Sequence, residues 1–218
     1  MHKLERDPVP PQGLSRYRHG KNQWGGQPLT PSLAERDEIW QKLNAMQGKR
    51  CAYCEGPIAD REKCHIEHFR QRHRYSQGTF DWNNLFGSCN RTDSCGDHKD
   101  NQSGAYPHEV LIKPDVENPE SFLLFTKDGA VHARKGLSPN DLHRAEETIR
   151  IFNLNGSLKA IRYAAVQGYI ETAEGLAALA AEQACSEEDL HSFLQAELKD
   201  TAHLPYATAI RHVLTPQY

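Results

Sequence analysis

Residues 51–99 contain five of the six cysteines, and this segment opens with Cys51-Ala52-Tyr53-Cys54. Two cysteines three positions apart can bind one tetrahedral metal ion, because the turn between them brings both sulfur atoms to the same side. A thioredoxin-like redox pair needs a helix that starts at the pair, whereas here Gly56-Pro57 follows almost at once. The pattern therefore predicts one half of a zinc site.

The other half of this site is expected downstream, at Cys89 and Cys95. Five residues separate these two cysteines, which is more than the usual spacing within a zinc-binding pair. Cys64 therefore stays open as a competitor of Cys95, whereas Cys185 lies in helical sequence and is predicted to be a small core residue. Six cysteines in a chain that opens without a secretory signal favour a metal over disulfides. The sequence thus predicts a structural Zn²⁺ bound by Cys51, Cys54, Cys89 and Cys95.

Chemically versatile residues lie between and beside the cysteine pairs. In Cys64-His65-Ile66-Glu67-His68-Phe69-Arg70, a carboxylate directly precedes a histidine. A carboxylate can hold a hard divalent cation, and a neutral imidazole can take a proton from water. Asn84 and the segment Gly96-Asp97-His98-Lys99 follow. Each piece alone has an ordinary structural explanation, but their order within 48 residues predicts a catalytic site.

This order of residues resembles the zinc-stapled HNH nucleases, which have a ββα-metal core with one divalent ion between a hairpin and a helix. The resemblance implies that His68 is the general base, that Asn84 braces the loop and orients the base, and that Glu67 and His98 bind a catalytic Mg²⁺ or Mn²⁺. Many such nucleases carry the helix ligand directly after the last cysteine, where this chain has Gly96. Two residues therefore stay open as substitutes for His98, namely Asn90 and Asp97.

Four longer segments together look like the PtuB family, the HNH component of Septu and of some retron anti-phage systems. They are Cys-Ala-Tyr-Cys-Glu at 51–55, His-Ile-Glu-His-Phe-Arg at 65–70, Asp-Trp-Asn-Asn-Leu-Phe at 81–86 and Cys-Gly-Asp-His-Lys-Asp at 95–100. The likeness covers residues 17–105 well and the rest loosely, and Gln71 stands where the family usually has proline. It implies a defence nuclease that hydrolyses nucleic-acid phosphodiester bonds, with DNA as the expected substrate, and works with a PtuA-type ATPase of the ABC/SMC-like class.

Two other functions stay open at this point. A tRNA or other RNA nuclease would use the same residues, and a zinc module without catalysis would bind nucleic acid or protein. The second alternative explains the four cysteines and the arginines, but it leaves Glu67-His68, Asn84 and His98 as coincidences.

The distribution of charge indicates where a polyanion would bind. Residues 1–105 hold 16 Lys and Arg against 13 Asp and Glu, whereas residues 106–218 hold 10 against 16. A nucleic-acid site is therefore expected in the first half. The candidates for backbone phosphate contacts are Arg70, Arg72, Arg74 and Lys99.

The chain divides into three parts on its sequence pattern. Residues 1–31 are rich in Pro, Gly and Arg without periodicity, so we expect an irregular arm, either a disordered tail or a segment that binds a partner through Tyr17 and Trp24. Residues 32–105 form the expected nuclease core, which opens with a helix from the capping box Ser32–Glu35 to about Gln47.

Residues 106–218 are predicted to contain a hairpin and an acidic helical bundle. Apolar runs at 122–125 and 130–133 flank Asp128-Gly129, which is typical of a hairpin turn. Helical periodicity then follows Ser138-Pro139, Gly156-Ser157 and Ser186, and recurs after Tyr206. This part has no catalytic pattern, so we expect it either to dock a partner or to complete the chain's own core. The fold class is therefore α+β and mostly helical.

The sequence excludes a membrane-spanning segment. No window approaches about 18 consecutive apolar residues, and the first seven residues, Met-His-Lys-Leu-Glu-Arg-Asp, lack the apolar run of a signal peptide. A cytoplasmic location is therefore expected. The length of 218 residues suits one or two domains.

Overall fold

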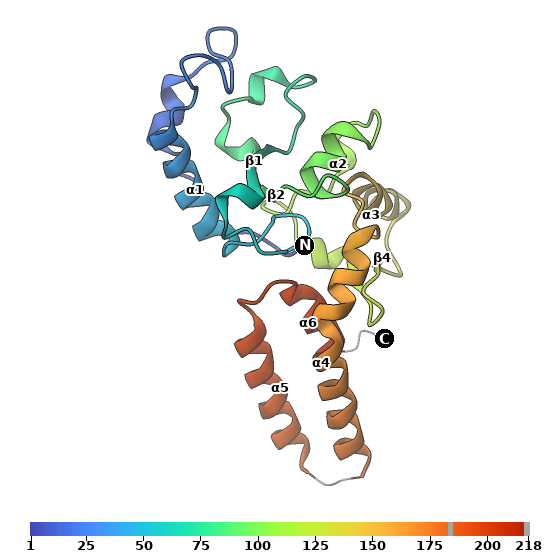
Figure 1. Cartoon of the computed structure of the whole chain (residues 1–218). Coiled ribbons are helices and arrows are strands. Elements are labelled where there is room, and N and C mark those ends of the chain that lie inside the picture. Colours follow the sequence, from blue (N-terminus) through green and yellow to red (C-terminus); the bar gives the residue numbers. More distant parts are fainter. Residues whose placement is uncertain (183–184, 216–218) are drawn as a thin grey trace.

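The computed structural model describes residues 1–182 and 185–215, and it confirms an α+β protein with two small antiparallel sheets (Figure 1). The main elements, in chain order, are α1 (Leu33–Gln47), β1 (Cys64–His68), β2 (Leu85–Cys89), α2 (Cys95–Asn101), β3 (Leu123–Phe125), β4 (Val131–Ala133), α3 (Pro139–Ile151), α4 (Ser157–Ala181), α5 (Glu187–Thr201) and α6 (Ala207–Leu214).

The capping residues of α1 fix both of its ends. The Ser32 hydroxyl accepts a hydrogen bond from the Glu35 amide, and the Glu35 carboxylate accepts one from the Ser32 amide, which confirms the predicted capping box. Gly48 ends the helix in the left-handed conformation at φ 60°. The buried Gln47 side chain then bonds both backbone groups of Gly87, at 2.8 and 2.9 Å. α1 is therefore fastened to the middle of β2.

Strands β1 and β2 form a hairpin that α2 follows directly. They pair antiparallel, with Cys64 opposite Cys89 and His68 opposite Leu85. The connection between them is the loop 69–84, which rises above the sheet in Figure 1. All residues of β2 are buried, because α1 covers the hairpin on one side and α2 contacts it on the other. The result is a compact strand–strand–helix unit.

Residues 1–31 are ordered against the rest of this chain. Met1, Leu4 and Leu14 are buried in the core. The Arg6 guanidinium stacks on Trp82 with its carbon 4.6 Å from the ring centroid, and it forms an ion pair with Asp115 at 2.5 Å. The arm is irregular apart from one 3-10 helix, Gln12–Arg16. Its few apolar contacts are too widely spaced to show as a sequence period, which is why the sequence suggested an arm without an internal partner.

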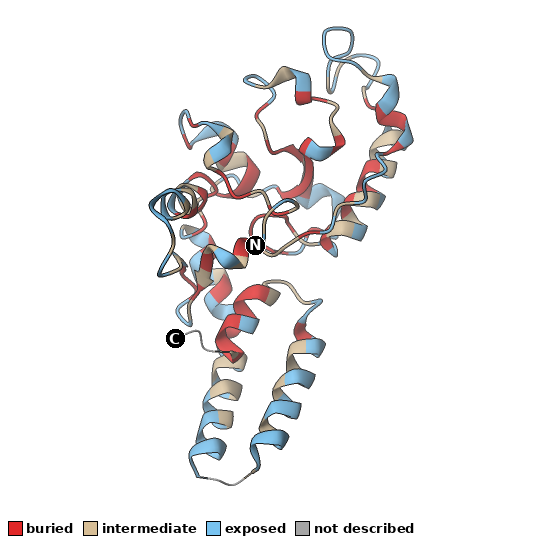
Figure 2. Ribbon diagram, turned by 180° about the vertical axis from the view of Figure 1, so that it is seen from behind, coloured by how far each residue is buried: buried red, intermediate tan, exposed pale blue. Residues whose placement is uncertain are grey.

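The second half of the chain has the predicted hairpin and helices in a different arrangement. β3 and β4 pair antiparallel around the Asp128-Gly129 turn, and the Ser138 and Ser186 hydroxyls cap α3 and α5. α4 and α5 form a long helical hairpin that projects from the body in Figure 1, and its far end is exposed in Figure 2. In the described residues of this half, α3, α6 and the first half of α4 each bury three or more residues, whereas α5 buries Thr201 alone. The helices therefore form a body with a projection rather than a compact bundle.

The two halves interlock at the cysteine segment. The Tyr53 ring stacks on Phe152 with centroids 4.1 Å apart, and the Cys95 amide donates to the Phe152 carbonyl at 2.9 Å. The Tyr206 amide donates to the Glu55 carbonyl at 3.1 Å. The end of α3 and the start of α6 thus support the segment that carries Cys51 to Cys95.

No helix within the described ranges combines the length and the apolar character that a membrane crossing needs.

A pair of glycines tests the packing of the β3–β4 hairpin. Gly129 and Gly136 both have φ 79°, but a Cβ on Gly129 would lie 2.2 Å from the Lys159 carbonyl oxygen of α4, whereas Gly136 has nothing within 4 Å. We expect Gly136→Ala to lower the free energy of unfolding by about 1 kcal/mol through backbone strain alone. Gly129→Ala should cost at least about 2 kcal/mol more, because α4 has to move. Urea denaturation measures both; equal losses would contradict this packing.

Candidate functional site

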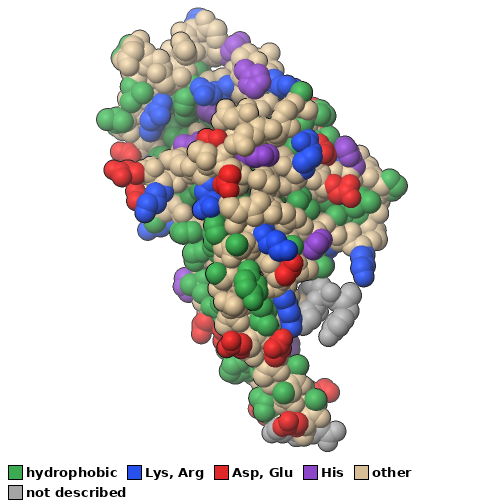
Figure 3. All heavy atoms as spheres, turned by 45° about the vertical axis from the view of Figure 1, so that its right-hand side comes forward, with side chains coloured by type: hydrophobic (Ala, Val, Ile, Leu, Met, Phe, Trp, Pro, Cys, Tyr) green, Lys and Arg blue, Asp and Glu red, His purple; other side chains and the backbone are tan. Residues whose placement is uncertain are grey.

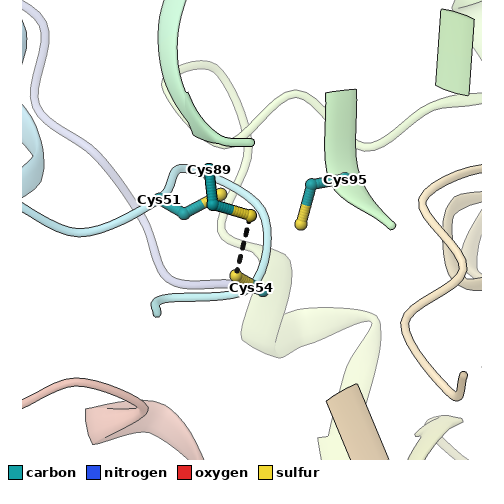
Figure 4. A group of neighbouring side chains, drawn as sticks. All are labelled: Cys51, Cys54, Cys89 and Cys95. Atoms are coloured by element: carbon teal, nitrogen blue, oxygen red, sulfur yellow. Dashed lines mark hydrogen bonds between the residues drawn. The ribbon is translucent and has the colours of Figure 1, made fainter. Parts of the chain in front are cut away.

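Four buried cysteines converge at the base of the strand–strand–helix unit (Figure 4). Their sulfur atoms all lie within 4.8 Å of one another, and the sulfurs of Cys54 and Cys89 are 3.9 Å apart. Thiolates about 2.3 Å from a tetrahedral zinc ion are about 3.8 Å apart, so the spacing fits such an ion. Among the described residues this is the only group of three or more potential ligands at this spacing. The cluster consists of the predicted residues, Cys51, Cys54, Cys89 and Cys95, and it can hold a structural metal such as zinc.

The four cysteines of the cluster come from three places in the fold. Cys51 and Cys54 lie in the turn after α1, Cys89 ends β2, and Cys95 starts α2. The Gly56 amide also donates to the Cys54 sulfur at 3.3 Å. Hydrogen bonds with neighbouring thiols raise the pKa of Cys54 and of Cys95 well above the ordinary value. Full ionisation of the four thiols therefore needs a bound cation.

The two remaining cysteines lie outside the cluster. The Cys64 sulfur donates to the Asp60 carbonyl at 3.2 Å, and burial raises the pKa of this thiol to about 11. Cys95, and not Cys64, is therefore the fourth member. Cys185 is half-buried in the connection between α4 and α5, so it is not the helical core residue that the sequence suggested.

Glu67 is buried at the end of β1, close to the start of α2. Its Oε1 lies 2.7 Å from the Lys99 ammonium, and its Oε2 lies 3.1 Å from His65 Nε2. Burial would raise the pKa of the carboxyl, but Lys99 and the hydrogen bond from His65 lower it to about 2. A Cβ on Gly96 would lie 2.6 Å from Oε2. Glycine at this position therefore lets the helix approach the carboxylate.

His68 follows directly and is held by one ring nitrogen. Its Nε2 lies 2.9 Å from the Thr79 carbonyl oxygen. A carbonyl only accepts hydrogen bonds, so Nε2 carries the proton and Nδ1 of the neutral ring is unprotonated. Among the described residues, no hydrogen bond engages Nδ1. Burial lowers the pKa of His68 to about 4, so the ring is neutral at pH 7 and can accept a proton.

Asn84 fixes the loop that supplies this carbonyl. Its Oδ1 accepts from the Arg70 amide at 2.7 Å, and its Nδ2 donates to the carbonyls of Arg70 and Gly78 at 3.2 and 3.0 Å. Thr79 is the next residue along the loop. Asn84 is thus placed to brace loop 69–84 and, through Thr79, to orient the His68 ring.

His98 and Asp97 form hydrogen bonds with groups other than Glu67. His98 Nδ1 lies 2.8 Å from the Ile151 carbonyl at the end of α3. Asp97 accepts a hydrogen bond from Asn101 within α2. The helix side chain that reaches the Glu67 carboxylate is Lys99.

His65 is the imidazole that the sequence interpretation missed. Its Nε2 faces Glu67, and its Nδ1 lies 2.7 Å from Asn90 Oδ1. Residues two positions apart in a strand lie on the same face, so the strand-like pattern of residues 64–68 already contained the signal. Asn90 therefore orients His65.

The four candidate phosphate-binding cations occupy different environments. Lys99 is fully buried, and its ammonium contacts the His68 carbonyl at 3.1 Å as well as Glu67 and Asp100. Its charge is therefore neutralised inside the protein. The arginines belong to loop 69–84, with one half-buried over Tyr75 and two exposed: Arg70, Arg72 and Arg74.

No protein-family model matches this chain, and no curated protein matches it. The function is therefore inferred from the residues and their geometry.

Metal analysis tests the cysteine cluster. We expect about one tightly bound zinc per chain, because a closed site of four thiolates is structural. Cys51→Ser should lose this zinc and destabilise the strand–strand–helix unit, whereas Cys64→Ser should retain it, since Cys64 is buried outside the cluster. Elemental analysis of purified protein measures the content. A folded wild-type chain without metal, or zinc loss in Cys64→Ser, would show that the assignment is wrong.

Proposed function

We propose that this chain is a metal-dependent endonuclease of the HNH type that hydrolyses phosphodiester bonds, with DNA as its substrate. The observation that carries the proposal is the strand–strand–helix unit, in which Glu67 and His68 end β1 beside α2. The four cysteines lie at the ends of this unit, as the resemblance to zinc-stapled nucleases implies. The PtuB likeness adds a role as an effector of anti-phage defence.

His68 is the general base in this proposal. Nδ1 takes a proton from a water molecule, which then attacks the phosphorus atom. The Thr79 carbonyl holds the other nitrogen, so the ring keeps the tautomer that the reaction needs. Asn84 contributes as a positioning residue, because it fixes the loop around Thr79.

The residues around Glu67 fit one divalent ion with few protein ligands. Glu67 Oε2 and His65 Nε2 are 3.1 Å apart, and neighbouring ligands of a six-coordinate ion at about 2.1 Å lie about 3 Å apart. Glu67 Oε1 already faces the Lys99 ammonium at 2.7 Å, so Oε2 is the carboxylate oxygen that would bind the ion. Glu67 Oε2 and His65 Nε2 would hold Mg²⁺ or Mn²⁺ here. The ion would replace the proton of the hydrogen bond between these two atoms. When bound, it supplies positive charge to the phosphate and to the leaving oxygen.

We also propose that the helical hairpin α4–α5 docks the PtuA-type ATPase that the family likeness implies. A groove of about 390 Å³ runs between the helices, and its apolar lining includes Leu179 and Phe193, which are 42% and 49% exposed. Residues 171–200 carry eight acidic side chains and one lysine. Charge complementarity therefore favours a basic, partly apolar surface on the ATPase, and the same charge opposes pairing of two copies of this hairpin.

Cleavage assays with purified protein test the catalytic proposal. The wild-type chain with Mg²⁺ or Mn²⁺, with and without the ATPase, should cut plasmid DNA. His68→Ala should lower the rate about 100-fold or more, with folding and zinc content intact, because it removes the base and no zinc ligand. His132→Ala, an exposed histidine on β4, is the matched control.

The same assay distinguishes the metal ligands. His65→Ala should raise the Mn²⁺ concentration needed for half-maximal cleavage more than His98→Ala does, since the His65 ring contacts Glu67 whereas the His98 ring bonds the Ile151 carbonyl. Cleavage of tRNA but not of DNA would show that the substrate is RNA and that the DNA assignment is wrong. A wild-type rate in His68→Ala would place the active site elsewhere, and binding without any cleavage would favour the zinc module.

Co-purification tests the docking surface. The double variant Leu179→Ala, Phe193→Ala should bind the ATPase at least about tenfold more weakly, because exposed apolar anchors contribute most to an interface. The control is Leu33→Ala with Val116→Ala, two side chains that are 72% and 65% exposed on other parts of the surface. Equal binding by both double variants would exclude the hairpin. Failure of the wild-type chain to bind would reject the partner.

A further inference from the structure

A second groove lies between the arm and loop 69–84, beside the candidate base. It has a volume of about 460 Å³ and two walls from distant parts of the sequence. The arm contributes residues 19–24, and the loop contributes Arg72, His73 and Thr79. Figure 1 shows these two segments rising side by side at the same end of the molecule.

Both walls of this groove are basic and free of carboxylates. Residues 13–34 contain three Lys or Arg and no Asp or Glu, and so do residues 68–80. Among the described residues, no ion pair neutralises Arg18, Lys21 or Arg72. In the view of Figure 3, Lys, Arg and His side chains lie at the upper end, whereas Asp and Glu side chains lie further down. The fold thus brings together positive charges that the sequence keeps about 50 residues apart.

A fourth cation supports the groove from α1. The Arg36 guanidinium lies over the Trp24 ring, 5.3 Å from its centroid. Burial and the nearby positive charge of Arg72 lower the pKa of Arg36. Like charges held close together without a carboxylate between them are typical of an anion-binding site.

Aromatic contacts place the groove next to His68. The Trp24 ring meets the His68 ring edge-on, with centroids 4.6 Å apart. Thr79, which lines the groove, also supplies the carbonyl that holds His68 Nε2. Tyr17 stacks on Phe80 with centroids 5.2 Å apart. These rings therefore seat the arm on loop 69–84, so they are engaged within the chain.

We infer that this groove binds the phosphodiester backbone of the nucleic acid on one side of the bond that is cut. The arm is then a substrate-binding wall rather than a partner-docking segment. The inference rests on the proposed function only in that the substrate is a nucleic acid. Phosphate contacts from Arg18, Lys21 and Arg72 position the strand without reading its sequence.

Salt-dependent binding tests the groove separately from cleavage. The full chain, without added Mg²⁺ or Mn²⁺, is titrated into fluorescein-labelled duplex DNA and into an RNA of equal length, at several salt concentrations. The triple variant Arg18→Gln, Lys21→Gln, Arg72→Gln should lower the magnitude of the slope of log K against log salt by about 2 to 3, since each lost phosphate contact removes about 0.7 to 0.9. The control is Lys127→Gln, Lys135→Gln, Lys159→Gln, which removes equal charge near β3 and β4.

The outcomes of this experiment test the groove independently of the nuclease proposal. A slope that falls in the first triple variant and not in the control supports the groove, even if the wild-type chain cuts nothing and the nuclease proposal fails. Equal slopes for the two triple variants overturn the groove, and they do so even if the wild-type chain cleaves DNA. A larger change with RNA than with DNA identifies RNA as the source of the backbone.

Discussion

The four-thiolate cluster is the constraint on which the candidate site depends. It joins the turn after α1 to the end of β2 and the start of α2. The β1–β2 hairpin has five residue pairs and α2 has seven residues, and neither is long enough to be stable alone in water. A metal ion bound by all four sulfurs would fix the helix against the hairpin. The same helix start places Gly96 against the Glu67 carboxylate.

The rest of the chain packs around this unit and places basic and acidic side chains at different ends of the molecule. The arm and loop 69–84 make a basic end around His68, and the α4–α5 hairpin makes an acidic projection. The buried ion pair between Glu67 and Lys99 links strand and helix within the unit. This charge distribution would attract the proposed polyanionic substrate to the end that carries the candidate base and repel it from the hairpin, in line with the proposal that the hairpin docks a protein.

Local signals were predictable from the sequence, and long-range contacts were not. The capping box at Ser32 and the Asp128-Gly129 turn each act within a short segment, and the structure confirms them. The cysteine cluster is the exception, because the demand of one metal ion for four thiol ligands predicts a contact between distant pairs. His98 and Lys99 show what sequence patterns could not predict. Neighbouring residues on a helix point about 100° apart, so the choice between them as the partner of Glu67 depends on how α2 is rotated. That rotation is fixed by the cysteine cluster and by α3, which sequence periodicity does not describe.

Hydrogen–deuterium exchange of the intact chain, with and without zinc, tests whether the cysteine cluster holds the candidate site together. We expect amides of β1, β2 and α2 to lose protection together when zinc is removed, while those of α3, α6 and the β3–β4 hairpin stay protected, because only the first group is held by the cluster. Unchanged protection of β1, β2 and α2 after the metal is gone would contradict the claim that the four thiolates hold the site together.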